Sequence, residues 1–185
     1  MHSLEIPEIA KLLRALRERQ DPQSQIHHLA ALTLFVTGTR VGQLRQIRGE
    51  DIFQKDGQWV VWLRSAKRGN ERIRNLRIDA DPAFDMTPLI EIAKLRGTSL
   101  IFGTLTRQYL NKILKEAAAA AGIHTAFGHT HIFRHSVAMA IWKQTLRLGA
   151  ITEFLGHRSA TTALCYLKEN DNRLGQSAVD ALVLA

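Results

Sequence analysis

The chain has 185 residues, of which 45% are hydrophobic and 23% are charged, so it is long enough for one globular domain with a buried core. Its net charge of +8 favours an anionic partner, most often a nucleic acid. Cys165 is the single cysteine, which excludes an intramolecular disulfide and a cysteine-based zinc site; we expect neither a signal peptide nor a membrane-spanning helix, because no long apolar run occurs.

The first fifty residues predict three helices. Apolar residues recur at helical spacing, and the Asp21-Pro22 pair separates the first helix from the second. Ser24 is the expected N-cap of the second helix. The three helices are expected over residues 7–19, 24–36 and 41–48.

The next segment carries the main β signal of the chain. Residues 59–63 are β-branched, aromatic or aliphatic, and a partner strand is expected over residues 73–78. The sequence between them, at residues 67–70, is typical of a turn. Asp56-Gly57 is expected to turn the chain into the first of these strands from a short strand near Ile52.

The rest of the chain predicts helices. They are expected over residues 88–96, 105–121, 131–143, 147–155, 159–168 and 175–184, with Gly122 as the cap of the second of them. The predicted fold class is therefore α+β, mostly helical with a small antiparallel sheet. No linker or repeat divides the chain, so we expect one domain over residues 1–185.

Taken one at a time, the polar residues have simple structural explanations. Arg40 can cap a helix C-terminus, Arg134 can be a surface charge, and Tyr166 can be a half-buried core tyrosine. His131 and His135 lie one helical turn apart, a spacing that zinc sites use. However, this segment lacks the glutamate of a His-Glu-x-x-His motif and Arg134 would repel a cation, so no metal site is expected.

Five segments, taken together and in order, resemble the conserved boxes of the tyrosine recombinase (phage integrase) family. The resemblance runs over about residues 24–168, and the family's catalytic-domain fold follows from it as an expectation. The segments are Thr37 to Leu44 followed by Arg48 to Ile52, Lys67 in its turn, His131-Ile132-Phe133-Arg134-His135, Leu155-Gly156-His157, and Tyr166 nine residues after His157.

The resemblance implies which residues hold the phosphate. A phosphodiester under attack gathers negative charge on its non-bridging oxygens, and the fixed fork of an arginine matches phosphate geometry. Arg40 and Arg134 are the expected arginines, and His157 is expected to donate a further hydrogen bond. Gln43 and His135 are expected next to the site without touching the phosphate.

The same resemblance assigns the steps of bond breakage. Tyr166 is the expected nucleophile, His131 its general base, and Lys67 the general acid that protonates the departing 5′ oxygen. The product would be a 3′-phosphotyrosine with a free 5′ hydroxyl. Neither a metal nor a nucleotide cofactor is expected, because the arginines supply the positive charge and the covalent bond conserves the energy for rejoining.

One residue departs from the family pattern. Family members usually carry an acid at the position of Gln43, three residues after the first arginine, where it forms an ion pair that orients the site. Glutamine can form the hydrogen bonds but brings no charge. We therefore expect reduced or retuned activity rather than none.

Basic residues crowd the predicted hairpin. One interpretation is a solvated edge whose charge prevents aggregation, and the other is contact with DNA phosphates, which the high net charge favours. The expected DNA contacts are Arg64, Arg68, Arg72 and Arg74.

The predicted function is site-specific DNA recombination by cleavage and rejoining, in the cytoplasm at the nucleoid. The expected partners are double-stranded DNA and further copies of the chain, assembled as a tetramer on paired sites, and no membrane. Two alternatives stay open: a DNA-binding regulator of the same fold with weak or no catalysis, and a type IB topoisomerase with the same chemistry.

The predicted domain has three parts and no N-terminal clamp domain. These are an N-terminal helix (1–23), a catalytic core (24–168) and a tail helix (169–185). The tail helix is amphipathic, and packing on its own domain or on a neighbouring protomer fits it equally well.

Overall fold

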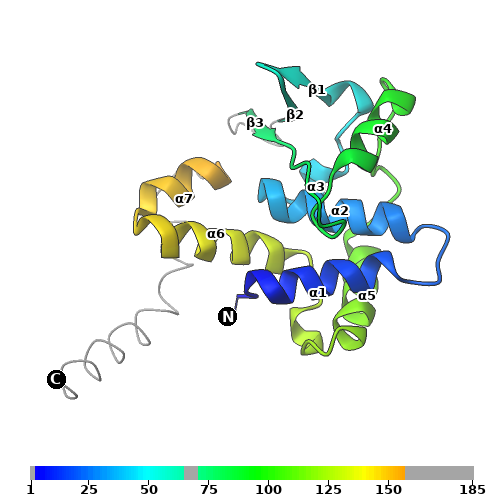
Figure 1. Ribbon diagram of the computed structural model, residues 1–185, viewed down its shortest axis with the longest axis vertical. Helices are drawn as coiled ribbons and strands as arrows, with labels where there is room; N and C mark the ends of the chain where they lie inside the picture. Colours follow the sequence, from blue (N-terminus) through cyan, green and yellow to red (C-terminus); the bar gives the residue numbers. More distant parts are fainter. Residues whose placement is uncertain (1–2, 65–70, 157–185) are drawn as a thin grey trace.

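The computed structural model describes residues 3–64 and 71–156. Within them the chain forms a helical body and a small antiparallel sheet, so the predicted fold class is confirmed (Figure 1). The elements are α1 (Ile6–Arg17), α2 (Ser24–Thr37), α3 (Val41–Leu44), the 3-10 turn η1 (Gly49–Asp51), β1 (Ile52–Lys55), β2 (Gln58–Leu63), β3 (Arg72–Asn75), α4 (Thr87–Arg96), α5 (Arg107–Ala120), the 3-10 turn η2 (Thr125–Phe127), α6 (His131–Thr145) and α7 (Leu148–Leu155).

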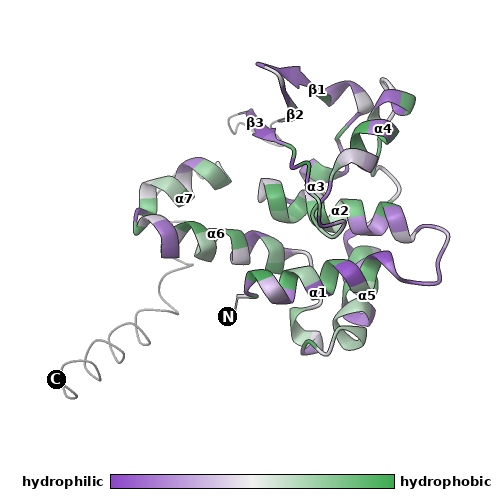
Figure 2. Cartoon of the chain, viewed as in Figure 1, coloured by the Kyte–Doolittle hydropathy of each residue, from purple (hydrophilic) through white to green (hydrophobic). Residues whose placement is uncertain are grey.

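The α2 helix lies in the middle of the molecule. It packs against α1 on one side and α6 on another, and its residues from Leu29 to Leu34 are all buried, as expected for a helix covered on most of its surface. α1 is amphipathic and begins with a capping box between Glu5 and Glu8. The sheet and α4 lie together at the end of the molecule away from α1 and α5 (Figure 1). Figure 2 shows that most hydrophobic residues belong to the helices, whereas β1 and β3 are largely hydrophilic.

The sheet has the strand order β1-β2-β3, with both pairs antiparallel. Its first turn is the predicted one: Asp56 and Gly57 have φ angles of 51° and 76°, the left-handed values that a two-residue hairpin turn needs. In the second pair, Val61 faces Arg74 and Leu63 faces Arg72. β3 therefore carries two arginines, Arg72 and Arg74, at the edge of the sheet opposite β1.

Several predicted boundaries were wrong. The third helix ends at Leu44 because residues 47 to 49 pair instead with the loop after α4, with Ile101 N–H donating to the Ile47 carbonyl at 2.9 Å. β3 ends at Asn75 rather than near Ile78. Ser24 is the first helical residue, and Gln23 occupies the N-cap position without a side-chain bond. The predicted helices at 159–168 and 175–184 lie outside the described residues.

The cap of α5 is as predicted. Gly122 has a φ of 69°, and its N–H donates to the Ala119 carbonyl at 3.2 Å. The next N–H, of Ile123, donates to the Ala118 carbonyl at 2.8 Å. These two bonds form a Schellman motif, which satisfies carbonyls that the end of a helix leaves free.

The described residues form two hydrophobic clusters. The main core draws on α1, α2, α4, α5, the sheet and the start of α6. A smaller cluster lies between α6 and α7 and consists of Ala138, Ile151 and Leu155, with partly buried residues around it. No helix in the described part of the chain is both long and apolar enough to cross a bilayer.

Candidate active site

The two predicted phosphate-binding arginines lie on different elements that meet at one glycine. Arg40 is exposed and is the N-cap residue of α3, just after the left-handed Gly38 that ends α2. Arg134 is buried in α6, where only 2% of its surface is exposed. Its guanidinium donates to the main-chain oxygen of Gly38 and, at 2.9 Å, to that of Leu155. The fold therefore fixes Arg134 against the backbone that leads to Arg40.

An open pocket of about 190 Å³ lies beside Arg40. Its charged lining comes from three elements, with Arg40 at the start of α3, Arg107 at the start of α5 and His131 at the start of α6. The other lining residues are Thr39, Val41, Gly42 and Thr130. The pocket thus combines small and polar surfaces with two guanidinium groups.

His131 is exposed at the first position of α6 and faces this cationic environment. Its pKa is lowered below the ordinary value, first by partial burial and then by Arg107, His129, Arg134 and Arg40. The imidazole is therefore neutral at pH 7 and can accept a proton. His135 is buried one turn further along α6.

Gln43 joins three segments next to the pocket. Its side-chain oxygen accepts from the Thr39 hydroxyl at 3.1 Å and from Arg72 at 3.5 Å. Its amide nitrogen donates to the main-chain oxygen of Arg64 at 3.1 Å. Gln43 therefore links the turn before α3 to Arg64 and Arg72 through hydrogen bonds, without a charge of its own.

Two of the arginines predicted to contact DNA have contacts within the chain that the sequence did not indicate. Arg72 is buried, and both it and Arg74 donate to the main-chain oxygen of Phe154, at 2.7 and 2.6 Å respectively. The guanidinium of Arg74 also lies over the Phe154 ring, 4.6 Å from its centroid. These contacts tie β3 to the C-terminal end of α7.

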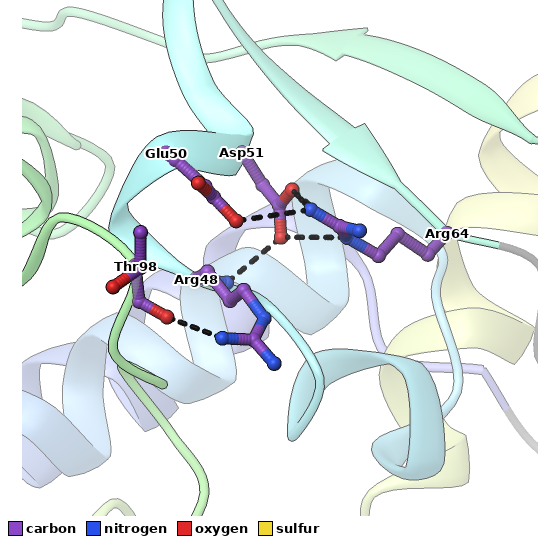
Figure 3. A network of polar contacts seen from close by, with 5 residues as sticks. All are labelled: Arg48, Glu50, Asp51, Arg64 and Thr98. Carbon is purple, nitrogen blue, oxygen red and sulfur yellow. Dashed lines mark hydrogen bonds and ion pairs between the residues drawn. The ribbon is translucent and has the colours of Figure 1, made fainter.

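Arg64 is held by two acids (Figure 3). It donates to Asp51 through Nε at 3.0 Å and Nη2 at 2.6 Å, and it pairs with Glu50 at 3.3 Å. The pKa of Arg64 is raised, mainly by its hydrogen bond to Asp51. Asp51 is almost fully buried and also accepts from the Arg48 N–H at 2.9 Å, so it anchors the end of β2 to η1.

The structure therefore brings together Arg40, Arg134, His131 and Gln43 from the predicted site. The remaining predicted site residues lie outside the described residues; they are Lys67, Arg68, His157 and Tyr166. Among residues 3–64 and 71–156, no group of three or more histidine, cysteine or acidic side chains is arranged to hold a metal ion.

Arg107 is a site residue that the sequence analysis missed. It follows Thr106, the N-cap residue whose hydroxyl accepts from the Tyr109 N–H at 3.1 Å, and this cap places Arg107 at the pocket. Its pocket neighbours Arg40 and His131 are distant in sequence, so only the folded chain reveals the group. Two cations and a neutral imidazole around a small open pocket can bind a phosphate group and take up a proton beside it.

The model of the phage integrase family matches residues 2–173. The chain belongs to this family. Among curated members it is 25% identical over 177 residues to the tyrosine recombinase XerH of Campylobacter jejuni, covering 92% of this chain and 49% of that protein. It is 36% identical over 153 residues to XerD of Rhizobium meliloti, covering 81% of this chain and 49% of the relative.

Solved structures of phage integrase family members have the same fold. XerH bound to palindromic difH substrate, in a post-cleavage complex, aligns with a TM-score of 0.75 at 23% identity, over 95% of this chain and 52% of that one. A lambda integrase dimer bound to a COC′ core site aligns with a TM-score of 0.64 at 24% identity, over 89% and 47%. The chain thus spans about half the length of these relatives.

Proposed function

We propose that this chain is a site-specific DNA recombinase that cleaves and rejoins DNA through a 3′-phosphotyrosine intermediate. The observation that supports this most is that Arg40 and His131 line one open pocket while Arg134 donates to the main chain two residues before Arg40, within a member of the phage integrase family. Relatives that are named as tyrosine recombinases point in the same direction.

In this proposal the scissile phosphate sits in the pocket between Arg40 and Arg107, with Arg134 behind it. The guanidinium groups stabilise the negative charge that builds up on the non-bridging oxygens during attack. Arg107 binds the scissile phosphate or the one next to it along the same strand. Arg64 remains a proposed contact to the DNA backbone further from the reaction.

Tyr166 attacks phosphorus and its proton passes to neutral His131. Lys67 protonates the departing 5′ oxygen, and His157 donates to a non-bridging oxygen. Rejoining reverses these steps with a 5′ hydroxyl as the attacking group. The full activity involves copies of the chain assembled on paired DNA sites, as a tetramer.

The test is a search for the covalent intermediate. The protein is incubated with nicked duplexes cut from the DNA that flanks its own gene, denatured, digested with nuclease and analysed by mass spectrometry. A nucleotide is expected on the peptide that contains Tyr166, and none in Tyr166→Phe. Tyr109→Phe is the matched control, because Tyr109 is the other tyrosine of the chain and lies on α5. An adduct that persists in Tyr166→Phe, or that maps to another residue, refutes the assignment.

The second candidate is a DNA-binding regulator with the same fold. Gln43 favours it, because an uncharged side chain occupies a position where the family usually has an acid. Retention of specific duplexes with no covalent product on any of them would establish this function instead. Relaxation of supercoiled plasmid at scattered sequences would identify a topoisomerase.

A further inference from the structure

Arg72 is a buried cation that lies between Gln43 and the C-terminal end of α7. It is 8% exposed, and its guanidinium donates through Nη1 to the Phe154 carbonyl at 2.7 Å and through Nη2 to the Gln43 oxygen at 3.5 Å. Burial, followed by the charges of Arg74, Arg134 and Arg40, lowers its pKa to about 10. Within the described residues it has no ion pair, so its two neutral acceptors hold it in place.

The first acceptor of Arg72, the Phe154 carbonyl, is adjacent in sequence to a carbonyl that accepts from Arg134. Phe154 and Leu155 are consecutive at the C-terminal end of α7, where carbonyls lack partners within the helix and carry partial negative charge. Arg72 holds the Phe154 carbonyl and Arg134 holds the Leu155 carbonyl. A Cβ on the next residue, Gly156, would lie 3.0 Å from Arg72 Cδ, so the two segments are packed closely.

The second acceptor of Arg72, the Gln43 side-chain oxygen, is bonded to the segment that carries Arg40. The Gln43 oxygen that Arg72 contacts also accepts from the Thr39 hydroxyl, and Thr39 directly precedes Arg40. The Thr39 N–H in turn donates to the Thr37 hydroxyl at 3.2 Å, which fixes the turn after α2. One guanidinium therefore connects the segment that carries Arg40 with the segment that holds Arg134.

We propose that Arg72 is a positioning residue that fixes Arg40 and Arg134 relative to one another around the phosphate pocket. This role rests on the proposed function for its catalytic effect, but the link itself is a property of the protein without DNA. An arginine suits it because a planar fork reaches two acceptors on separate elements at once, whereas a lysine offers a single point charge. Small displacements matter here, because a shift of about 1 Å between reacting groups can slow a reaction about 100-fold.

The experiment compares Arg72→Lys with Arg77→Lys. Both substitutions keep the charge, but Arg77 is exposed and pairs with Asp79, whereas Arg72 donates to Phe154 and Gln43. The rate of covalent adduct formation at saturating DNA is expected to fall about 10- to 100-fold in Arg72→Lys and to change less than about 3-fold in Arg77→Lys, with DNA affinity nearly unchanged in both. Equal rates in the two variants, or a loss of affinity rather than of rate, overturn the proposal.

Gln43→Leu breaks the same link from its other end and leaves Arg72 in place. Its rate loss is expected not to add to that of Arg72→Lys in the double variant, because both remove one connection. Additive losses in the double variant contradict the proposal. Circular dichroism identifies any variant that fails to fold.

A measurement without DNA separates this proposal from the proposed function. Amide hydrogen exchange of residues 153–156 is expected to be faster in Arg72→Lys than in wild type, and unchanged in Arg77→Lys, which is exposed and pairs with Asp79. If wild type forms no adduct on any duplex, the proposed function fails while this result still shows whether the link exists. Unchanged exchange in Arg72→Lys refutes the link.

Discussion

The guanidinium of Arg134 donates to the main-chain oxygen of Gly38, two residues before Arg40. Gly38 has a φ of 59°, and a Cβ there would lie 2.7 Å from Leu155 Cδ2. Leu155 is also the residue whose carbonyl accepts the second hydrogen bond of Arg134. The ends of α2 and α7 and the first turn of α6 therefore meet at a residue that has to lack a side chain.

Gly38→Ala tests this convergence. The substitution forces an L-residue into the left-handed region and pushes against Leu155, so it is expected to lower the free energy of unfolding by about 1–3 kcal/mol. Denaturant unfolding measures the change. Gly42→Ala is the control, because a Cβ at Gly42 would have no atom within 4 Å. Equal stability of the two variants would show that the end of α2 is not tightly packed against α7.

Alanine substitutions at Arg40 and Arg134 are expected to have different effects on the free energy of unfolding. Arg40 is exposed, so Arg40→Ala should change stability by less than about 0.5 kcal/mol while abolishing adduct formation. Arg134→Ala leaves two buried carbonyls without this donor and should also cost about 2–4 kcal/mol of stability. Thermal unfolding and the adduct assay are measured side by side. Arg45→Ala is the control and should retain adduct formation, because Arg45 is exposed at the other end of α3 and donates to the Gly103 carbonyl.

The cleavage rate is expected to depend on His131. Burial and then Arg107 lower the pKa of His131, so the rate in wild type should fall on the acidic side only as the pH drops through this lowered pKa and His131 becomes protonated. Arg107→Ala removes the largest of the charge effects, so the pKa should rise and the acidic limb of the rate should move to higher pH. A histidine with a lowered pKa in the folded state also stabilises the fold above pH 6.5, and this contribution is lost as pH falls through the folded pKa.

NMR titration of the His131 ring in wild type and Arg107→Ala measures the pKa directly. Lys112→Ala on the same helix is the control, because Lys112 does not line the pocket. If the His131 pKa is the same in Arg107→Ala as in wild type, Arg107 does not face the imidazole.

Asp51 and Glu50 both pair with Arg64 but should differ in importance. Asp51 is buried and also holds the Arg48 N–H, so Asp51→Ala is expected to cost about 1–3 kcal/mol of unfolding free energy. Glu50 is exposed, and Glu50→Ala should change stability by less than about 0.5 kcal/mol. Denaturant unfolding separates the two. Equal effects would mean that Asp51 acts only as a surface charge.

Local patterns explain which parts of the fold the sequence predicts well. The Asp56-Gly57 turn, the cap at Gly122 and the amphipathic helix α1 each depend on neighbours within a few residues. The third helix was too long because a distant loop, at Ile101, competes for the backbone at Ile47. That competition leaves no trace in the local sequence.

The predicted site likewise contains residues that motifs in the sequence identify and contacts that only the folded chain reveals. Arg40, His131 and Arg134 could be found by motif and spacing, and the fold brings them together. Arg72 was predicted on a charged hairpin, but its acceptor Phe154 is 82 positions away in the chain, and only tertiary structure shows that the side chain turns inward.

The division of the core into two clusters affects the fraction of molecules in which α7 is docked against α6. The first half of α6, at Ile132 and Phe133, belongs to the main core, whereas Ala138 packs with α7 in the small cluster. A unit with so few buried contacts opens at a lower free energy than the whole domain. Separation of α7 would take the Leu155 acceptor from Arg134 and leave the one at Gly38. On the proposed function, we therefore expect the population of competent molecules, and with it the apparent affinity for a substrate phosphate, to follow the equilibrium between docked and undocked α7.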